Sequence, residues 1–503
     1  MADDTKTATT TAAETEAKPQ VAEIKRSWGD VADDEEEEEE QSETATTAAS
    51  TSKEKGVSEL GVDKLKIEDD NREEKELDEP DDSRIQAVTS GDTPYTSAAT
   101  FEDLNLSPEL LKGLYVEMKF QKPSKIQAIS LPMILTPPYK DLVAQAHNGS
   151  GKTTCFVLGM LSRVDPKNSR TQALCICPTR ELSLQNLEVL RRMGKYTGIS
   201  SHCAVPMDKG NNDRPKPLSY ISAQVVIGTP GTIKKLLSLR KLSISDMKVL
   251  VFDEADQMLA KEGFQDDSLR IMKDIQRFSP SCQVLFFSAT FNEDVKNFVS
   301  RVVKQGSNQL FVKKEELSLD AVKQYKVYCP DEMAKVLVIK DRILELAEKL
   351  GQTIIFVKTR RSASMLHQAL VDLGYEVTTI HGALNVEDRD KIVKEFKDGL
   401  TQVLISTDVL ARGFDQQQVN LVINYDLPVK YGTSEPDYEV YLHRIGRAGR
   451  FGRKGAVFNF VMFDSDSTIM EKIDRYFGTR VTEIPSWNSE EDFTVALQSA
   501  GLM

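Results

Sequence analysis

The sequence has few residues of the kinds that build metal clusters or disulfide frameworks. Its 503 residues include six cysteines and five histidines, and no two cysteines form a CxxC pair. The scattered histidines make no ligand cluster, so a zinc site is not expected. Several cysteines lie in apolar runs, which is typical of small core residues in a reducing compartment rather than of a disulfide-stapled secreted protein.

Long apolar runs are also missing. No stretch is long and apolar enough to span a bilayer, and the N-terminus lacks the apolar core of a signal peptide. We therefore expect an intracellular protein without membrane insertion. Hydrophobic residues make up 40% of the chain, which is enough to bury two cores of ordinary size.

Acidic charge dominates the chain, but it is unevenly distributed. The formal net charge is -14, and an unbroken acidic run covers Asp33–Glu40. Residues 1–95 are rich in Thr, Ala, Glu and Asp and cannot bury enough apolar surface to offset their ordering entropy. We predict a disordered acidic tail there. Ser58–Leu77 has scattered apolar residues that could form a short amphipathic helix on a partner or on the folded body, and a merely solvated tail is the simpler alternative. The remainder is close to neutral and slightly basic, which is compatible with a nucleic-acid partner.

Strand-like apolar runs alternate with helical patterns in two successive series after this extension. This alternation predicts parallel sheets flanked by helices, and hence two tandem α/β domains. We place the first domain at 96–314, a polar linker at 315–322 and the second domain at 323–503, with residues 469–497 as helix and turn. The expected strands are Leu142–Ala146, Ala173–Cys177, Val225–Gly228, Lys248–Phe252 and Gln283–Phe287, then Thr353–Val357, Val377–Ile380, Gln402–Ile405, Leu421–Asn424 and Ala456–Val461.

A phosphate-binding loop follows the first strand. The sequence matches G-x-x-x-x-G-K-[ST], with Ala146 in place of the first glycine. Backbone N–H groups of such a loop converge on phosphate oxygens, Lys152 would reach the β and γ phosphates, and Thr153 would bind Mg2+. The loop residues are Ala146, His147, Asn148, Gly149, Ser150, Gly151, Lys152, Thr153 and Thr154.

Three carboxylates follow the buried strand that ends at Phe252. Such acids are costly at the end of a buried strand unless a cation neutralises them, although a solvated surface turn is the simpler alternative. Together with the phosphate loop they predict an NTPase site, in which Asp253 acts through Mg2+, partly by way of water, and Glu254 polarises the attacking water. Ser288, Ala289 and Thr290 follow the next strand, where hydroxyl residues most often cap a helix.

The second domain supplies arginines that the first-domain site lacks. His443 is followed by Arg444, Arg447 and Arg450 with interleaved glycines. A solvated basic loop is one interpretation. We favour arginines delivered across a cleft, because an arginine at the γ-phosphate accelerates phosphoryl transfer by orders of magnitude.

Together these motifs resemble the DEAD-box family of RNA-dependent ATPases, from about Phe101 to the C-terminus. Further markers are Phe120–Gln127, which is similar to the family's adenine-reading Q motif, and the segments Pro178–Leu182, Thr229–Gly231 and Ile354–Val357. The resemblance implies two RecA-like domains that close around ATP, Mg2+ and single-stranded RNA. It also implies an ATP hydrolase with RNA helicase activity and a monomeric state.

The resemblance assigns roles residue by residue. Phe101 would stack on adenine, Phe120 and Gln127 would bind it, and Gly413 and Asp415 would contact the nucleotide. Lys152, Asp253, Glu254, Arg447 and Arg450 would be catalytic. RNA would contact Thr179, Arg180, Thr229, Pro230, Gly231 and Thr407, without sequence preference, and coupling would involve Ser288, Ala289, Thr290, Arg412 and His443. The chain departs from the family at Thr232, where an arginine is usual, and in lacking a Gly-Gly pair within 195–224.

Within the family, Ala144–Asp165 and the insert Lys430–Tyr438 resemble the plant members that export mRNA at the cytoplasmic face of the nuclear pore. This implies a regulatory N-terminal extension over residues 1–95, messenger ribonucleoprotein as substrate, nuclear-pore proteins as partners and an export-factor activator bound to an inositol polyphosphate. It also implies a location in cytoplasm, nucleus and nuclear envelope. The alternatives are an ATP-gated RNA clamp, a helicase of translation or another RNA-processing step, a DNA helicase and an inactive scaffold.

Overall fold

The computed structural model describes most of the chain after the acidic extension. Everything it describes belongs to one compact unit, Pro80–Met503. The predicted extension therefore lies outside the described residues, apart from a short strand. The described residues are 86–88, 95–145, 150–206, 219–260, 263–311, 322–346, 351–408, 416, 418–430, 432–449, 454–478 and 481–503.

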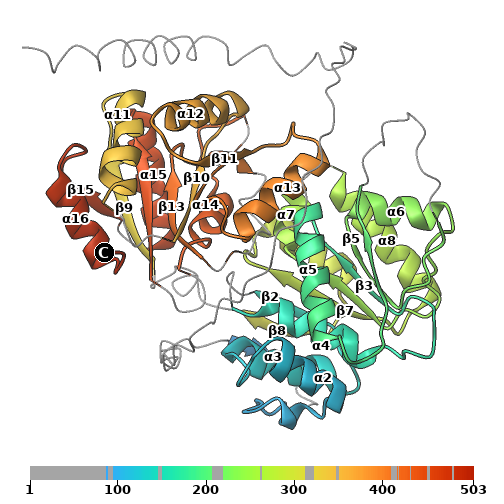
Figure 1. Cartoon of the computed structure of the whole chain (residues 1–503). Coiled ribbons are helices and arrows are strands. Elements are labelled where there is room, and N and C mark those ends of the chain that lie inside the picture. The colour runs from blue at the N-terminus through green and yellow to red at the C-terminus, as the bar shows by residue number, and fades with distance from the viewer. Residues whose placement is uncertain are drawn as a thin grey trace, which may run out of the picture. The chain divides into compact units, whose positions relative to one another are not determined.

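The first lobe contains an eight-stranded sheet in the order β1-β8-β2-β7-β6-β3-β5-β4 (Figure 1). Its neighbouring strands pair in parallel, except that β1 runs antiparallel to β8. The strands are β1 Gln86–Val88, β2 Leu142–Gln145, β3 Ala173–Ile176, β4 Ser201–Ala204, β5 Val225–Gly228, β6 Val249–Phe252, β7 Gln283–Ser288 and β8 Asn308–Phe311.

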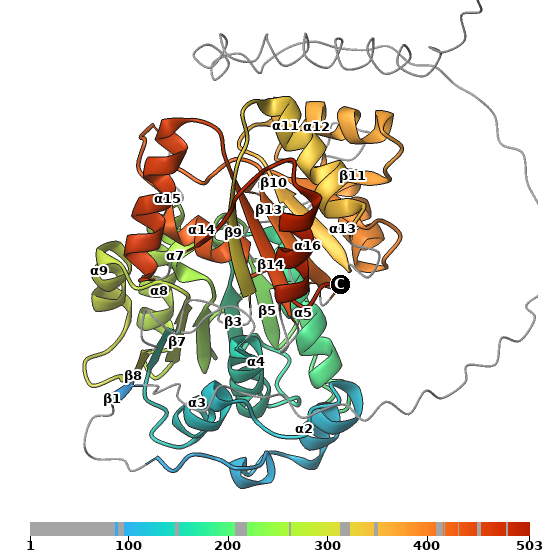
Figure 2. The same cartoon turned by 90° about the vertical axis from the view of Figure 1, so that its left-hand side faces the viewer.

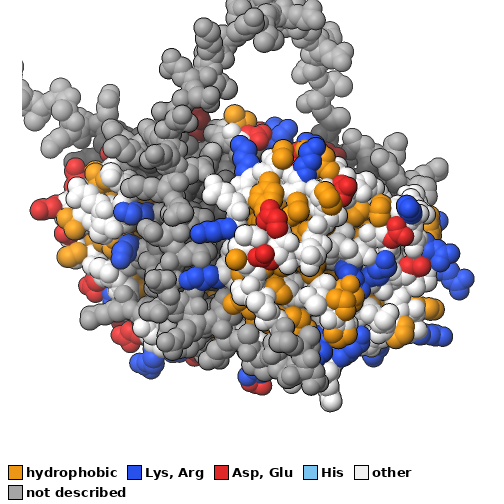
Figure 3. Space-filling view, turned by 90° about the horizontal axis from the view of Figure 1, so that it is seen from below, with side chains coloured by type: hydrophobic (Ala, Val, Ile, Leu, Met, Phe, Trp, Pro, Cys, Tyr) orange, Lys and Arg blue, Asp and Glu red, His pale blue; other side chains and the backbone are white. Residues whose placement is uncertain are grey.

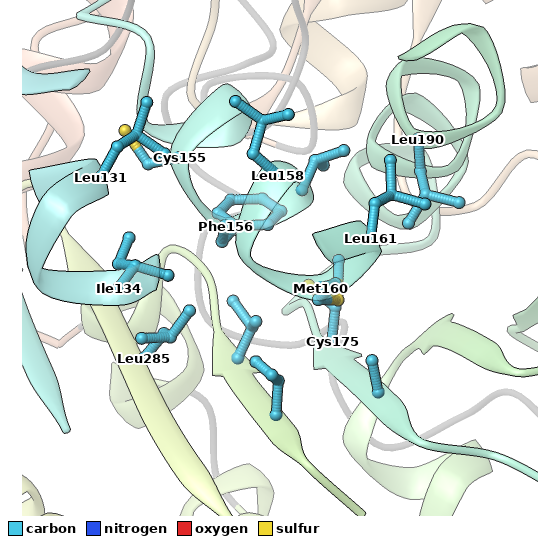
Figure 4. Packing of buried hydrophobic residues seen from close by; sticks show 14 of the residues in the cluster. Leu131, Ile134, Cys155, Phe156, Leu158, Met160, Leu161, Cys175, Leu190 and Leu285 are labelled. Atoms are coloured by element: carbon cyan, nitrogen blue, oxygen red, sulfur yellow. The ribbon is translucent and has the colours of Figure 1, made fainter. Parts of the chain in front are cut away.

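Helices cover both faces of this sheet, because side chains of a strand point alternately to its two sides. Phe287 packs with Phe156 on one face, whereas its neighbour Phe286 packs with Phe252 and Phe298 on the other. Figure 4 shows the first of these cores around Phe156. The helices are α2 Pro108–Lys112, its π-helical continuation Gly113–Glu117, α3 Lys125–Leu135, α4 Lys152–Arg163, α5 Arg180–Met193, α6 Pro230–Ser238, α7 Ala255–Ala260, α8 Phe264–Phe278 and α9 Glu293–Val302.

The second lobe contains a seven-stranded parallel sheet in the order β11-β12-β10-β13-β14-β9-β15 (Figure 2). Its strands are β9 Val322–Tyr328, β10 Gln352–Phe356, β11 Val377–Ile380, β12 Val403–Ser406, β13 Val419–Asn424, β14 Gly455–Val461 and β15 Thr482–Ile484. Its helices are α11 Glu332–Leu337 with a π-helical continuation Val338–Leu344, α12 Arg360–Asp372, α13 Val386–Lys397, α14 Tyr438–Ile445, α15 Asp464–Phe477 and α16 Glu490–Ser499.

The predicted fold class, two tandem RecA-like domains, is confirmed, and every predicted strand is present with ends that shift by a residue or two. Several strands were not predicted, and three of them correct a stated expectation. β1 lies inside the segment 1–95 that was expected to be disordered, and β9 begins at Val322, inside the expected linker. β15 lies inside residues 469–497, which were expected to be helix and turn. Two of its three residues are exposed, so the strand does not appear in the sequence as a run of apolar residues.

All six cysteines are free thiols, as the sequence predicted. Within the described ranges, no helix combines the length and the apolar character that crossing a membrane requires. Figure 3 shows one face of the molecule, on which Lys and Arg side chains alternate with acidic and apolar ones and do not form a single basic field.

Candidate nucleotide and RNA site

The motifs of the first lobe meet at one edge of its sheet. β2 and β7 pair so that Gln145 lies opposite Ser288, and the Gln145 side-chain amide donates to the Ala289 carbonyl over 3.3 Å. The segments that leave these strands, together with Asp253 after β6, therefore start from neighbouring positions. The carboxyl edge of a parallel sheet is where open α/β folds bind their ligands.

Side chains of the Q motif donate hydrogen bonds to backbone carbonyls of the phosphate loop. Ser124 Oγ donates to the Ser150 carbonyl over 2.9 Å, and Gln127 Nε2 donates to the Gly151 carbonyl over 3.3 Å. Gly151 has φ of 97°, and a Cβ there would clash with Gln127 Nε2, so only glycine fits. Gln127 Oε1 also accepts from the Ser124 N–H. The first function of Gln127 is thus to position the loop, and its contact with adenine stays a prediction.

The two aromatic residues expected at adenine differ in accessibility. Phe101 is 0% exposed and packs edge-on against Tyr115 and stacks against Phe120. The Phe120 ring is only partly buried. This placement argues against direct stacking of Phe101 on adenine, because a fully buried ring presents no free face. We assign Phe101 to the support of Phe120, which is the ring a base can reach.

The loop residues that the structure describes sit at the start of α4. Lys152 is the first residue of this helix and is buried, as is Thr154, whereas Ser150 and Thr153 are partly exposed. The helix N-terminus and the Lys152 ammonium both favour an anion here. The four preceding loop residues, Ala146, His147, Asn148 and Gly149, lie outside the described residues.

Asp253 and Glu254 form a buried acidic pair. Asp253 is 3% exposed; its Oδ2 accepts from Asn186 Nδ2 over 2.7 Å and its Oδ1 from the Glu254 N–H over 3.1 Å. Burial, and to a smaller extent the Glu254 carboxylate, raises the pKa of Asp253 to about 6. The hydrogen bond from Asn186 and the charge of Lys152 oppose this rise.

Glu254 is strained and has an unpaired oxygen. Its φ of 47° lies in the left-handed region, which costs a non-glycine residue about 1–2 kcal/mol. It is 6% exposed, and its Oε2 is buried without a hydrogen-bond partner among the described residues. Buried carboxylate oxygens normally have partners, so this atom fits a site completed by a ligand or water.

The acidic pair fits a magnesium ion that takes most of its ligands from elsewhere. Among the described residues, no group of three or more His, Cys, Asp or Glu is arranged to hold a metal. Mg2+ bound with nucleotide needs only one or two protein oxygens and fills its remaining positions with phosphate and water. The Thr153 hydroxyl and the Asp253 carboxylate are donors of the right kind.

Asp256 joins the two lobes. Its Oδ2 accepts from Thr290 Oγ1 over 2.8 Å and from the Thr290 N–H over 3.2 Å, and it lies 3.4 Å from His443 Nε2 of the second lobe. Asp256 and His443 are both buried. Thr290 and His443, two of the residues expected to couple the lobes, thus share one carboxylate. Ser288 and Ala289 are buried beside them, and Arg412 lies outside the described residues.

Salt bridges between α5 and α13 form a second link between the lobes. Arg180 lies 2.6 Å from Asp390, and Arg389 lies 2.5 Å from Glu181. We call these the α5–α13 pairs. Arg180 also donates to the Pro206 carbonyl over 3.1 Å. Arg180 was expected to bind RNA, but its Nη1 and Nη2 contact protein groups, and only Nε lacks a partner among the described residues. The structure therefore favours a role in holding the lobes together, and the RNA contact stays a prediction.

The other residues expected at RNA lie at the starts of α5 and α6. Thr179 follows β3 and Thr229 follows β5, and these strands are paired neighbours. Thr179 Oγ1 accepts from the Leu182 N–H, and Thr229 Oγ1 lies 3.2 Å from Thr232 Oγ1. Pro230 and Gly231 begin α6, and Thr407 follows β12 in the second lobe. Thr179 is partly exposed and Gly231 is exposed, whereas Thr229 and Pro230 are buried and the Thr229 N–H donates to the Ala204 carbonyl over 3.0 Å. Hydroxyls and backbone N–H groups at the exposed parts of such helix starts suit a phosphate backbone.

The arginines of the second-lobe motif have different environments. Arg444 is 1% exposed; its Nε donates to Asp408 Oδ1 over 2.8 Å, and its Nη1 donates to the Asp426 carbonyl over 2.7 Å. Arg447 is 3% exposed and its Nε donates to the His443 carbonyl over 3.0 Å. Arg444 thus stabilises the second lobe. Its sequence context did not distinguish this structural role from the catalytic role predicted for Arg447. Arg450, Gly413 and Asp415 lie outside the described residues.

Comparison with known proteins decides the family. Residues 124–298 match the DEAD/DEAH box helicase model, and residues 334–452 match the helicase conserved C-terminal domain. DEAD-box ATP-dependent RNA helicase 38 of Arabidopsis thaliana is 66% identical over 448 residues, which cover 89% of this chain and 90% of that protein. The chain belongs to the DEAD-box family of ATP-dependent RNA helicases. The predicted family and the predicted ATP-hydrolysing activity are thereby confirmed.

Solved structures of a yeast relative have the same fold as this helicase. Saccharomyces cerevisiae Dbp5 bound to RNA and ADP BeF3 is 39% identical, with a TM-score of 0.74 over 80% of this chain and 100% of that one. A variant of Dbp5 bound to Nup159, a Gle1 variant, IP6 and ADP is 38% identical, with a TM-score of 0.57 over 78% of this chain and 99% of that one. These likenesses cover both lobes of the helicase.

Three residues of this helicase that hold other site residues in place were not identified from the sequence. Asn186 lies on the buried face of the amphipathic helix α5, and a polar residue on such a face is a usable signal. Arg389 and Asp390 lie on α13, where adjacent charged residues look like any solvated helix surface. No signal in the sequence singles them out, because their partners are more than 200 residues away.

Charge reversal across the α5–α13 pairs distinguishes lobe closure from RNA contact. We expect Arg180→Asp to raise the RNA concentration for half-maximal ATPase activity roughly ten-fold, because closure then opposes two like charges. Adding Asp390→Arg in the same chain should recover most of that loss. RNA titrations of the ATPase rate for the single and double variants test this. If the double variant recovers none of the lost RNA affinity, Arg180 contacts RNA directly.

Proposed function

We propose that this helicase binds single-stranded RNA without sequence preference and uses ATP hydrolysis to unwind RNA locally or to remodel RNA–protein complexes during mRNA export. The observation that carries the proposal is the Asp256 carboxylate, which contacts Thr290 of the first lobe and His443 of the second. Because the shared carboxylate lies three residues beyond Asp253, closing the lobes affects the nucleotide site directly. RNA that favours the closed form then stimulates turnover.

The nucleotide half of the mechanism uses first-lobe residues. Lys152 and the α4 N-terminus bind the β and γ phosphates, and Gln127 keeps the loop in place. Thr153 and Asp253 hold Mg2+, which when bound neutralises phosphate charge. The unpaired Oε2 of Glu254 accepts the proton of the attacking water. Arg447 and Arg450 complete the γ-phosphate site from the second lobe.

The RNA half uses groups that recognise a ribose-phosphate backbone. The starts of α5 and α6 offer Thr179, Thr229, Pro230 and Gly231, and the second lobe offers Thr407. Hydroxyl and backbone N–H donors contact phosphate and 2′-OH and do not identify bases. Thr232 adds a hydroxyl where family members usually place an arginine, so this chain binds one phosphate more weakly.

The export role rests on the relatives. Because Dbp5 of yeast forms a complex with Nup159, Gle1 and IP6, we propose equivalent partners for this helicase: a nuclear-pore protein and a Gle1-like activator with an inositol polyphosphate. Its place of action would be the cytoplasmic face of the nuclear pore, with the protein also present in cytoplasm and nucleus.

The experiment that tests the RNA-dependent activity compares ATPase rates without polynucleotide, with unstructured RNA and with DNA of the same sequence. We expect strong stimulation by RNA alone. Equal stimulation by DNA would contradict the ribose-reading role of the α5 and α6 starts. A parallel strand-displacement assay on a short duplex separates a helicase from an ATP-gated clamp, because a clamp hydrolyses ATP without releasing a strand.

A second assay addresses the export partners. Adding a plant Gle1 homologue with IP6 should raise the RNA-stimulated ATPase rate several-fold, and IP6 alone should not. If the homologue neither binds nor stimulates the full chain, the export role fails while the RNA-dependent ATPase stands, and a helicase of translation or another RNA-processing step becomes the better assignment.

A further inference from the structure

We propose that Asn186 is a positioning residue for Asp253, and that it links lobe closure to the magnesium site. The proposal rests on the proposed function, in which Asp253 holds Mg2+. Asn186 lies in the middle of α5, a helix whose first turn faces the second lobe. Its Nδ2 donates to Asp253 Oδ2 over 2.7 Å.

The burial of Asn186 shows that this hydrogen bond determines the position of its amide. The side chain is 0% exposed, and its Oδ1 is buried without a partner among the described residues. An amide turned the other way would place Oδ1 against the carboxylate, so the NH2 group must face Asp253. Leaving Oδ1 unpaired costs free energy. The second contact of Nδ2, at 3.4 Å from Cys177 Sγ, is weaker and does not offset that cost.

Asp253 is consequently held at both carboxylate oxygens. Oδ2 accepts from Asn186, and Oδ1 accepts from the backbone N–H of Glu254 over 3.1 Å. These two donors come from different elements, and together they prevent rotation of the carboxylate. The remaining lone pairs then have one fixed orientation for a cation or its bound water, which is how hydrogen-bonded neighbours tune a metal ligand.

The position of Asn186 on α5 gives it a second role. Arg180 and Glu181, at the start of the same helix, form the α5–α13 pairs with the second lobe. Because an α-helix moves as a rigid element, a shift of α5 on lobe closure also moves Asn186 relative to Asp253. The geometry of the magnesium site thus depends on whether the lobes are closed.

The test measures Mg2+ affinity through nucleotide binding in the full-length chain, so it does not depend on turnover. A fluorescent ADP analogue is titrated at increasing Mg2+ concentrations and in EDTA, for wild type, Asn186→Leu and Ser183→Ala. Ser183 is the matched control, because its buried hydroxyl lies one turn earlier on α5 and donates only to the Thr179 carbonyl. Leu keeps the branching of Asn at Cγ, with larger terminal groups, and removes the donor.

We expect Asn186→Leu to raise the Mg2+ concentration for half-maximal nucleotide binding by about ten-fold. The affinity of Asn186→Leu for the ADP analogue in EDTA should match that of the wild type. The Mg2+ midpoint of Ser183→Ala should also match the wild-type value. An unchanged Mg2+ midpoint in Asn186→Leu overturns the positioning role while leaving the proposed function intact. A wild type whose nucleotide binding ignores Mg2+ overturns the proposed magnesium site itself. If Asn186→Leu does not fold, Asn186→Ala carries the same expectation.

The link to lobe closure has its own readout. In the wild type, saturating single-stranded RNA should lower the Mg2+ midpoint, and in Asn186→Leu the midpoint should respond less. An equal response to RNA in both proteins would remove the coupling role and leave only the fixed orientation of the carboxylate.

Discussion

Replacing Glu254 by Gln is expected to lower RNA-stimulated ATP turnover by roughly 100- to 10,000-fold while ATP and RNA binding remain intact. Gln has the shape of Glu but accepts a proton from water far less readily. The Glu254 Oε2 atom is buried and has no hydrogen-bond partner among the described residues, as expected for a base whose partner is the attacking water. Glu254 has a left-handed backbone at φ 47°, and because Gln differs from Glu only at the end of the side chain, we expect the variant to keep this geometry.

The contrast with Asp253→Asn sharpens this test. Asp253 holds Mg2+ in the proposed site, so Asn at 253 should weaken Mg2+-dependent nucleotide binding as well as turnover. Glu254→Gln should spare binding. Single-turnover ATP hydrolysis and nucleotide titrations on both variants distinguish the two roles. Near-normal turnover in Glu254→Gln would show that another group accepts the proton.

The fold was predictable wherever a strand is buried on both faces. β3, β5 and β6 are apolar runs of four fully buried residues, and each was placed from the sequence. β4 and β15 lie at the edges of their sheets, and most of their side chains are partly or fully exposed. Such strands need not be apolar, because solvent covers one side, and so they leave little signal in the sequence.

The site was predictable at the level of which motifs converge, but not of which atoms meet. Polar residues at strand ends predicted that the segments after β2, β6 and β7 share a site, and these strands are paired neighbours in the sheet. The contact of Gln127 with Gly151 was not predicted. The pairing of Asp256 with His443 depends on the contact between the lobes, which no local pattern encodes. Arg180 was expected at RNA from the family resemblance, and its pairing with Asp390 likewise depends on the contact between the lobes.

Replacing Arg447 by Ala should lower mainly catalytic turnover, whereas replacing Arg444, in the same motif, should lower mainly stability. Arg447→Ala is expected to lower turnover of the folded protein by roughly 1,000-fold, because an arginine at the γ-phosphate acts mainly on the transition state. Loss of its hydrogen bond to the His443 carbonyl should lower the free energy of unfolding by only about 1 kcal/mol. Arg444→Ala is expected to lower the free energy of unfolding by roughly 2–4 kcal/mol, because it leaves Asp408 and the Asp426 carbonyl without their buried donor. Its loss of activity should follow its loss of folded protein.

Thermal unfolding and ATPase assays at matched folded fractions separate these outcomes. Arg450→Ala should behave as Arg447→Ala does, with impaired hydrolysis and retained ATP binding, because the first lobe alone holds the nucleotide. Arg447→Lys serves as the control for charge: it keeps the cation but loses the planar fork that contacts two oxygens, so we expect it to stay well below wild type. A large loss of ATP binding in Arg447→Ala with normal turnover at saturation would place this arginine in ground-state binding and not at the γ-phosphate in the transition state.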